Sequence, residues 1–263
     1  MLGSIFDIEV RIDINKEFRK MVKYFQHTEN TTFYKERCYS LIGAIDKKAF
    51  KKWPYRGTAI NCEEYLDNIG LSCFCFTDGS IIEKDKFLYY LEFIYNIIKF
   101  SAENSYIRTE DETIIALIAN IFEIAEKINY KFVECGDKCL LLKRDADVDV
   151  ILELVDEDIA KLLLEYNDFK VKADLHRKRE ILKSLDIFIE KNQLNYSKLD
   201  KDTYGSIGYI MNNFGINHKI NSKYKDNDID LIQWYDKCFT LCIHLIRLSQ
   251  IREINNERKS LES

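Results

Sequence analysis

The sequence predicts a mainly α-helical protein that contains one small β-hairpin element. Hydrophobic residues make up 46% of the 263 residues, which is enough to bury a core and excludes a wholly disordered chain. Proline occurs once and glycine nine times, whereas the tight turns of a β-sandwich or barrel need many of both. Most of the chain instead repeats apolar residues at helical spacing, which favours a helical fold.

The first part of the chain, residues 1–104, is predicted to be α-rich with a short leading strand. Apolar residues nearly alternate with charged ones over Ser4–Ile14, as in a half-buried strand. Helices are expected here over Lys16–Phe25, from Asn61 onward and over Asp85–Ala102. A further helix is expected to start at a cap formed by Thr31 or Thr32 and to end at Lys52, just before Pro54.

Residues 105–160 are predicted as a connector that consists of a helix and the β-hairpin. An acidic first turn after Thr109 favours a helix to Ile128. Two apolar stretches then flank the turn Gly136-Asp137, as in a hairpin over residues 130–144. This hairpin is either the wing of a winged-helix DNA-binding module or a packing element. The lack of a basic recognition helix favours packing.

Residues 161–258 are predicted as a C-terminal helical bundle, and residues 259–263 as a frayed tail. Within the bundle, a stripe of Phe239, Ile243 and Ile246 follows one side of the last helix. It lines either a dimer seam or the core. The helices expected here cover Asp174–Glu190, Asp200–Asn213 and Ile229–Arg258.

Charge and targeting signals narrow the function classes. Lys and Arg number 39 against 44 Asp and Glu, a net charge of −5, which makes a general nucleic-acid binder a poor fit but permits a local basic face. The N-terminus lacks the pattern of a signal peptide, and no apolar run reaches ~18 residues. We therefore expect a cytoplasmic protein with reduced thiols and no membrane partner.

The cysteines offer one possible metal site. The pairs Cys135/Cys139 and Cys238/Cys242 have a spacing that zinc sites use. No close Cys or His completes either pair, and the first flanks a turn while the second lies in an apolar helix. Turn and core roles are therefore favoured, and we expect no metal and no cofactor.

The sequence contains no Gly-rich phosphate loop, no HExxH or GxSxG motif and no EF-hand loop, so the candidate chemistry depends on one histidine. His218 follows the second helix of the bundle in MNNFGINHKIN, just after Gly205, Gly208 and Gly215, which indicate a non-helical spot there. A solvent-accessible histidine can act as acid or base near neutral pH. Its asparagine neighbours either assist it or only terminate helices and turns. The candidate catalytic set is His218, Asn217, Asn212 and Asn213.

A basic cluster in the helix expected over Asp174–Glu190 is the candidate nucleic-acid-binding surface. It comprises Arg177, Lys178 and Arg179, to which Lys219 after the candidate histidine is added. Consecutive helical positions point in different directions, so part of this cluster is a solvated helix wall. The rest can contact phosphate groups.

Over residues 161–255 the chain resembles the C-terminal helical domain of bacterial abortive-infection, HEPN-like families. The matching positions are Tyr166-Asn167, Asp174, Lys178, Asn212-Asn213, His218 and Trp234-Tyr235-Asp236. The resemblance implies an all-α bundle, often dimeric, that is associated with phage defence.

Ribonucleases of this kind pair an Arg that holds the phosphate with a His that transfers protons. In this chain Asn212 and Asn217 stand where relatives have Arg, and no Arg lies between Arg179 and Arg247. A neutral amide supplies no positive charge for a phosphate. An active enzyme would need that charge from Lys219 or from a partner chain, so the resemblance leaves enzymatic activity open.

Three hypotheses follow. The first is a phage-defence protein whose HEPN-like bundle serves interaction or dimerisation. The second is a metal-independent ribonuclease that uses His218, and the third is a winged-helix DNA-binding protein that uses the 130–144 hairpin. The expected partners are a second copy bound through the C-terminal helix, RNA, or a phage or host protein.

Overall fold

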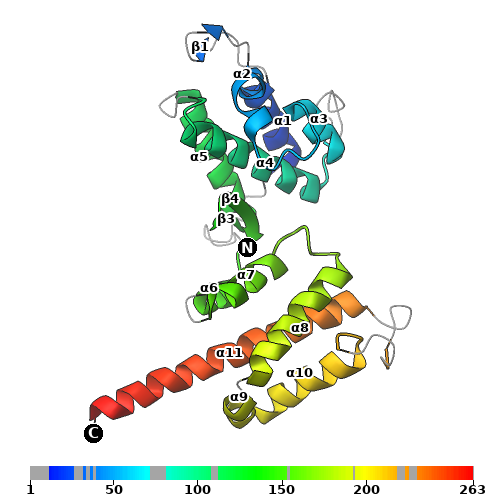
Figure 1. Cartoon of the computed structure of the whole chain (residues 1–263), viewed down its shortest axis with the longest axis vertical. Coiled ribbons are helices and arrows are strands. Elements are labelled where there is room, and N and C mark those ends of the chain that lie inside the picture. Colours follow the sequence, from blue (N-terminus) through cyan, green and yellow to red (C-terminus); the bar gives the residue numbers. More distant parts are fainter. Residues whose placement is uncertain are drawn as a thin grey trace, which may run out of the picture. The chain divides into compact units, whose positions relative to one another are not determined.

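The computed structural model describes residues 12–26, 32–33, 36–37, 40–71, 81–107, 112–152, 155–191, 193–217, 223–224 and 230–262. These residues are mainly helical with a small two-stranded hairpin, which confirms the predicted fold class (Figure 1). The chain divides into two compact units, Met1–Leu142 and Lys143–Ser263. The expected connector, 105–160, is therefore shared: its first helix and hairpin belong to the first unit, and the helices that follow belong to the second.

The first unit is built around one long helix. Helix α4 packs against α1, α2 and α5, and nine of its residues are buried. The elements of this unit are α1 (Ile14–Gln26), β1 (Thr32–Phe33), β2 (Glu36–Arg37), α2 (Leu41–Lys48), the 3-10 helix η2 (Phe50–Lys52), α3 (Cys62–Asn68), α4 (Lys84–Glu103), α5 (Glu112–Lys127), β3 (Tyr130–Cys135) and β4 (Lys138–Lys143).

Local signals set several of these boundaries. Asn61 caps α3, because its side chain accepts a hydrogen bond from the Glu64 backbone N–H at 2.8 Å. Gly136 has a φ of +65° in the turn between β3 and β4, a conformation that favours glycine. The start of α3 at Asn61 and the hairpin turn at Gly136 were both predicted, and each depends on residues close in sequence.

The segment before α2 differs from the prediction. Instead of one helix from Thr31 or Thr32 to Lys52, the chain forms the antiparallel pair β1–β2 and then α2, which Ser40 caps. Ser40 accepts from the Gly43 N–H at 3.1 Å, so the helix begins at the cap that can satisfy its first turn. The predicted leading strand over Ser4–Ile14 falls mostly on residues outside the described ranges.

The second unit is a helical bundle around its last helix. Helix α11 packs against α6, α8, α9 and α10, and α7 packs against α8. The elements are α6 (Ala146–Ile151), α7 (Glu157–Tyr166), α8 (Leu175–Lys191), α9 (Gln193–Leu199), α10 (Lys201–Asn213) and α11 (Leu231–Glu262).

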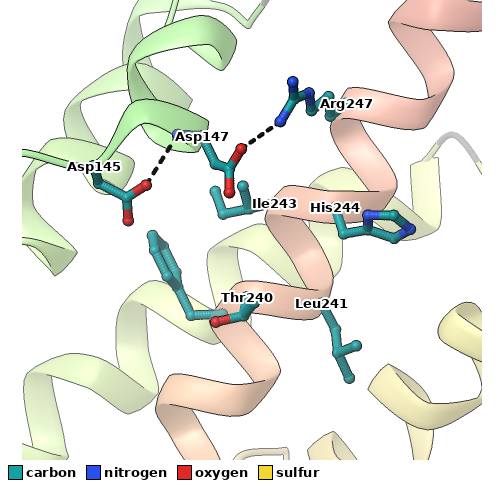
Figure 2. A pocket seen from close by; sticks show the side chains of 8 residues that line it. Asp145, Asp147, Thr240, Leu241, Ile243, His244 and Arg247 are labelled. Atoms are coloured by element: carbon teal, nitrogen blue, oxygen red, sulfur yellow. Dashed lines mark hydrogen bonds and ion pairs between the residues drawn. The ribbon is translucent and has the colours of Figure 1, made fainter.

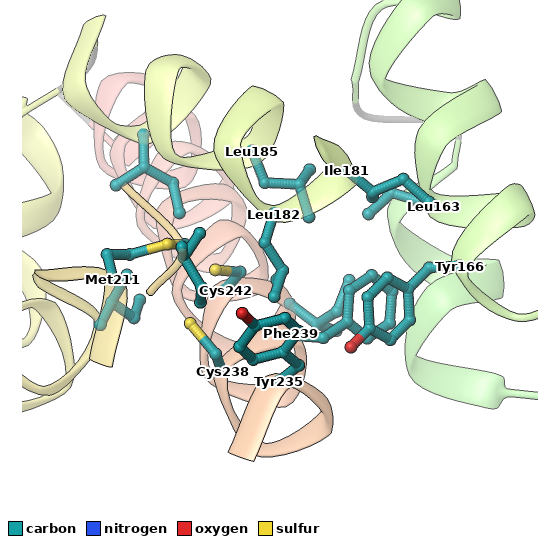
Figure 3. Packing of buried hydrophobic residues seen from close by; sticks show 14 of the residues in the cluster. Leu163, Tyr166, Ile181, Leu182, Leu185, Met211, Tyr235, Cys238, Phe239 and Cys242 are labelled. Carbon is teal, nitrogen blue, oxygen red and sulfur yellow. The ribbon is translucent and has the colours of Figure 1, made fainter. Parts of the chain in front are cut away.

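The core of this bundle takes up the apolar stripe of α11. Figure 3 shows Phe239 stacked on Tyr166, with ring centres 3.9 Å apart and planes 4° apart. Phe239, Ile243 and Ile246 are each at most 5% exposed. The stripe that the sequence left between a dimer seam and the core therefore belongs to the core.

Two features of the bundle were not predicted. The short helix α9 has a largely polar sequence, and its Tyr196 is buried at 4% exposure. Helix α11 continues to Glu262 rather than fraying after Arg258, and its last turns hold residues of good helix propensity such as Glu257 and Lys259.

Candidate functional site

A polar cluster in the second unit joins three residues on which the family resemblance depends. Tyr166 donates its hydroxyl hydrogen to Asp236 Oδ1 at 3.0 Å, and Lys178 Nζ donates to the same oxygen. Lys178 Nζ also lies 4.9 Å from the centre of the Tyr166 ring. The Lys178 side chain is 4% exposed and that of Asp236 is 51% exposed. The cluster therefore ties α7, α8 and α11 together, with its carboxylate at the solvent edge.

The surroundings of Tyr166 keep its hydroxyl protonated. Burial raises the pKa of Tyr166, and the negative charge of Asp236 and the hydrogen bond to it raise the pKa further. Tyr166 is thus a neutral hydrogen-bond donor and not a general base.

A second set of buried polar contacts fixes the end of α10. Arg179 Nε donates to the Tyr235 hydroxyl oxygen at 3.3 Å, and that hydroxyl donates to the Phe214 carbonyl oxygen at 3.1 Å. Arg179 is 8% exposed and Tyr235 is fully buried. The contacts link α8 and α11 to the turn that follows α10, which leads to the candidate catalytic segment.

The predicted asparagines hold this turn. Asn213 Nδ2 donates to the Tyr209 carbonyl at 2.8 Å, which caps the end of the helix. Asn217 donates its backbone N–H to the Met211 carbonyl at 3.0 Å and its amide to Asp186 Oδ2 at 2.9 Å. Asn212 is exposed. These contacts correspond to the structural alternative for the asparagines, whereas His218 and Lys219 lie outside the described residues.

The predicted basic surface is mostly internal. Lys178 and Arg179 are buried, and their charged groups bond to Asp236 and Tyr235 inside the bundle. In this structure the two side chains are therefore not part of an exposed phosphate-binding surface. Arg177 is 42% exposed and pairs with Glu165 through Nε and Nη2. The run of cations is therefore not one surface, because successive helical positions face different neighbours.

A groove runs along α11 beside α6. It has a volume of about 250 Å³ and is lined by Asp145, Asp147, Phe239, Thr240, Leu241, Ile243, His244 and Arg247. Figure 2 shows Arg247 turned toward Asp147, while His244 points away from both aspartates. His244 Nε2 lies 4.0 Å from Asp200 Oδ2 instead. The polar groups of this groove are paired separately and do not converge on one reacting centre.

Among the described cysteines, Cys62, Cys139, Cys238 and Cys242 are buried, whereas Cys135 is partly exposed. Cys238 and Cys242 are fully buried in the core of the bundle, and the hydrogen bond with Cys238 and burial both raise the pKa of the Cys242 thiol. Burial raises the pKa of the Cys139 thiol, although Lys99 Nζ lies 3.5 Å from its sulfur. Thiols with raised pKa values carry little thiolate near neutral pH. Within the described ranges, no group of three or more metal-ligating side chains comes together.

The β3–β4 hairpin is attached to α4 by side-chain contacts to its backbone. Asn96 donates to the Cys139 carbonyl and accepts from the Cys139 N–H, both at 2.7 Å. Glu92 Oε2 accepts from the Leu141 N–H at 3.0 Å. These contacts give the hairpin a packing role in the first unit. Binding of DNA by this hairpin stays a prediction.

Comparison of the chain with protein-family models, curated proteins and solved structures returned no match. None of the helices in the described part of the chain has the length and apolarity needed to cross a bilayer. The functional argument therefore depends on the residues themselves. Sequence reasoning did not single out Tyr209 of α10, which is 48% exposed and belongs to no motif, whereas Trp234 at the start of α11 is partly buried against Phe214.

Proposed function

We propose that the chain is a cytoplasmic bacterial defence protein of the abortive-infection type. In this proposal the helical bundle of the second unit is a HEPN-like module that associates with a second copy. The resemblance over residues 161–255 motivates the family. The cluster of Tyr166, Lys178 and Asp236 supports a structural role for the matching positions, since their polar groups bond to one another inside the bundle.

The observation that carries the proposal is the end of α11, residues 247–262, which we call the C-terminal arm. Among the side chains of α11 that the structure describes, the last buried one is Ile246, and all those from Ile251 onward are exposed. In Figure 1 the red end of α11 extends past the other helices of its unit. An isolated helix of about 16 residues is only marginally stable in water, so a partner helix would stabilise the arm.

The arm carries an apolar stripe suited to pairing with a copy of itself. Ile251, Ile254 and Leu261 are 47%, 55% and 88% exposed. With Arg258 between them, their spacing alternates three and four residues, as in a coiled-coil seam. An antiparallel pair centred near residue 256 would set Ile251 of one copy against Leu261 of the other, and Ile254 against the aliphatic stem of Arg258.

Self-association is tested by light scattering over a dilution series. The wild type is expected to dimerise, and the double variant Ile251→Glu/Ile254→Glu to remain monomeric, because two charges would have to be desolvated in the seam. Ile187→Glu is the matched control, since Ile187 on α8 is 54% exposed but lies outside the arm. A wild type that is monomeric throughout, or a control that dissociates like the arm variant, contradicts the proposal.

The defence role is tested separately in bacteria challenged with phage. Expression of the wild type is expected to lower the plaque count, and the arm variant to lose that protection while Ile187→Glu keeps it. Equal plaque counts with and without the wild type, across a broad phage panel, would argue against a defence function.

A ribonuclease that uses His218 is the second candidate function. What motivates it is the sequence, in which His218 directly follows the turn that Asn217 anchors to Met211 and Asp186. Purified protein is incubated with total RNA or tRNA, and cleavage is expected to disappear in His218→Ala but not in His176→Ala, whose histidine is on an exposed face of α8. Cleavage that survives His218→Ala excludes this mechanism.

A further inference from the structure

Helix α5 of the first unit is apolar on two nearly opposite faces. The inner face is buried and carries Ile114, Leu117, Ile121, Ile124 and Ala125. The other face, which we call the outer stripe, carries Ile115, Ile118, Ala119 and Phe122. A helix that is apolar all round is normally buried all round, whereas a surface helix has a single apolar stripe. Packing within the first unit therefore accounts for only one of the two faces.

The outer stripe is open to solvent. Ile115 is 53% exposed, Phe122 is 44% exposed, and Ala119 between them is also exposed. Helix α5 lies at one side of the first unit (Figure 1). Apolar side chains that share one exposed face indicate an interaction site, whereas single exposed ones are common on any protein.

One end of the outer stripe is held in place before any partner arrives. The ring of Phe122 packs against Tyr95 of α4 and Phe132 of β3, with ring centres 5.2 Å and 5.3 Å away. Those two rings also contact each other, with centres 4.4 Å apart. A partner that covers Phe122 would therefore lose little free energy in ordering its side chain.

The spacing of the outer stripe matches a partner helix. Ile115, Ala119 and Phe122 are separated by four and three residues, as in the seam between two packed helices. At 1.5 Å per residue this apolar part is about 10 Å long, which two turns of a second helix would cover. Amphipathic helices are recognised through side chains at this spacing.

The two ends of the outer stripe are acidic. The same spacing reaches the exposed Glu112 before Ile115 and the exposed Glu126 after Phe122. Glu123 beside the stripe forms an ion pair with Lys127, which lowers its pKa. Lys20 of α1 lowers the pKa of Glu123 further, so this carboxylate is already balanced by lysines.

These end charges decide what kind of partner fits. Two copies of α5 that overlapped along the whole stripe would bring carboxylates together at both ends, whichever way the helices ran, and like charges at such contacts are destabilising. We propose that the outer stripe binds an amphipathic helix of a partner protein that carries Lys or Arg at both ends of its apolar face. This inference goes beyond self-association, which the proposed function assigns to the C-terminal arm.

The test is a titration of a fluorescent synthetic helix with the full-length protein, followed by anisotropy. The probe has about 18 residues, enough for a helix to form on binding, with leucines at three- and four-residue spacing between lysine-bearing ends. One control peptide has glutamate in place of lysine, and another has the residues of the probe in scrambled order. The lysine-ended probe should bind saturably and more tightly than both controls.

A variant of the stripe and a matched control separate docking from general attraction. Ile115→Gln should weaken binding about tenfold, because docking would bury the exposed half of that side chain. Its thermal midpoint should stay the same, since glutamine is a good helix former. Ile60→Gln is the control, because Ile60 is 65% exposed in the first unit but lies before α3.

A second pair of variants tests the acidic ends. Glu112→Gln/Glu126→Gln should weaken binding of the lysine-ended probe about fivefold at low salt and less at high salt. Glu63→Gln/Asp67→Asn removes two charges from exposed positions of α3 and should leave the affinity unchanged.

The outcomes are distinguishable. The proposal is overturned if the lysine-ended probe does not bind, if the glutamate-ended peptide binds as tightly, or if Ile115→Gln leaves the affinity unchanged. Loss of a dimer by Ile115→Gln in light scattering would also overturn it, because a second copy would then cover the stripe. The arm variant Ile251→Glu/Ile254→Glu should bind the probe like the wild type, so a failure of self-association is not confused with a failure of docking.

Discussion

The paired charges of Lys178 and Asp236 should contribute very unequally to stability. The ammonium group is in a side chain that is 4% exposed, whereas the carboxylate belongs to one that is 51% exposed. Asp236→Ala leaves a buried cation without its counter-charge, which costs 3–5 kcal/mol when both partners are buried. Because solvent reaches the position of Asp236, we expect the lower end, about 3 kcal/mol.

Lys178→Met should cost much less. Methionine keeps the length and apolar volume of the lysine stem, and the remaining Asp236 keeps its hydrogen bond from Tyr166 and its contact with water. We expect a loss below about 1 kcal/mol. The double variant Lys178→Met/Asp236→Ala should then be about 2 kcal/mol more stable than Asp236→Ala alone, because the buried ammonium charge has been removed.

Urea unfolding followed by Trp234 emission measures these differences. The chain has two tryptophans, and Trp53 belongs to the first unit, so each variant is made in a Trp53→Phe background. The slope of stability against urea should stay constant if only the native state is affected. The reasoning is refuted if Lys178→Met destabilises the unit as much as Asp236→Ala, or if the double variant gains nothing over Asp236→Ala.

Three further predictions concern single side chains. Asn96→Ala should destabilise the first unit by about 3 kcal/mol, because it removes the side chain that bonds to both the N–H and the carbonyl of Cys139. Asn104→Ala, at an exposed position, should cost under about 0.5 kcal/mol. Urea unfolding followed by Trp53 emission compares the two variants, and equal losses would contradict the argument. The pKa of Tyr166 is raised above its ordinary value of 10.0 in the folded state. The stability that its protonated hydroxyl gives to the fold is therefore complete below that pH and is lost as the pH rises beyond it. Tyr166→Phe should therefore lose less thermal stability than the wild type between about pH 9 and 11, and parallel curves would argue against this. Gly208→Ala should raise stability by about 1 kcal/mol because its Cβ meets open space, and a lower melting temperature would show a close contact there.

The parts of the fold that were predictable are those that neighbouring residues determine. Asn61 precedes an acidic turn, and its side chain can cap α3 whatever the rest of the chain does. Gly136 permits the hairpin turn for the same local reason. The apolar repeat of α4 is also local, since its spacing alone defines the face that becomes buried.

The burial of Lys178 and Arg179 could not be predicted in this way. Their exposure depends on Asp236 and Tyr235, which are more than fifty positions away in the sequence. A run of three basic residues on a helix is normally solvated. Lys178 lies three, four and seven positions before the buried Ile181, Leu182 and Leu185, but this spacing does not reveal the counter-charge that a buried lysine requires. The resemblance did include Tyr166, Lys178 and Asp236, so those positions were recognised before their contact was known.

The glycines before His218 show how far a local rule reaches. The helix predicted over Asp200–Asn213 is confirmed as α10 and contains Gly205 and Gly208, so of the three glycines only Gly215, which has a positive φ, marks the expected non-helical spot. A helix that keeps two glycines with open space above them lacks any stabilising gain from them. Alanine at either position would fill open space and gain helix propensity, so local helix propensity does not account for the two glycines.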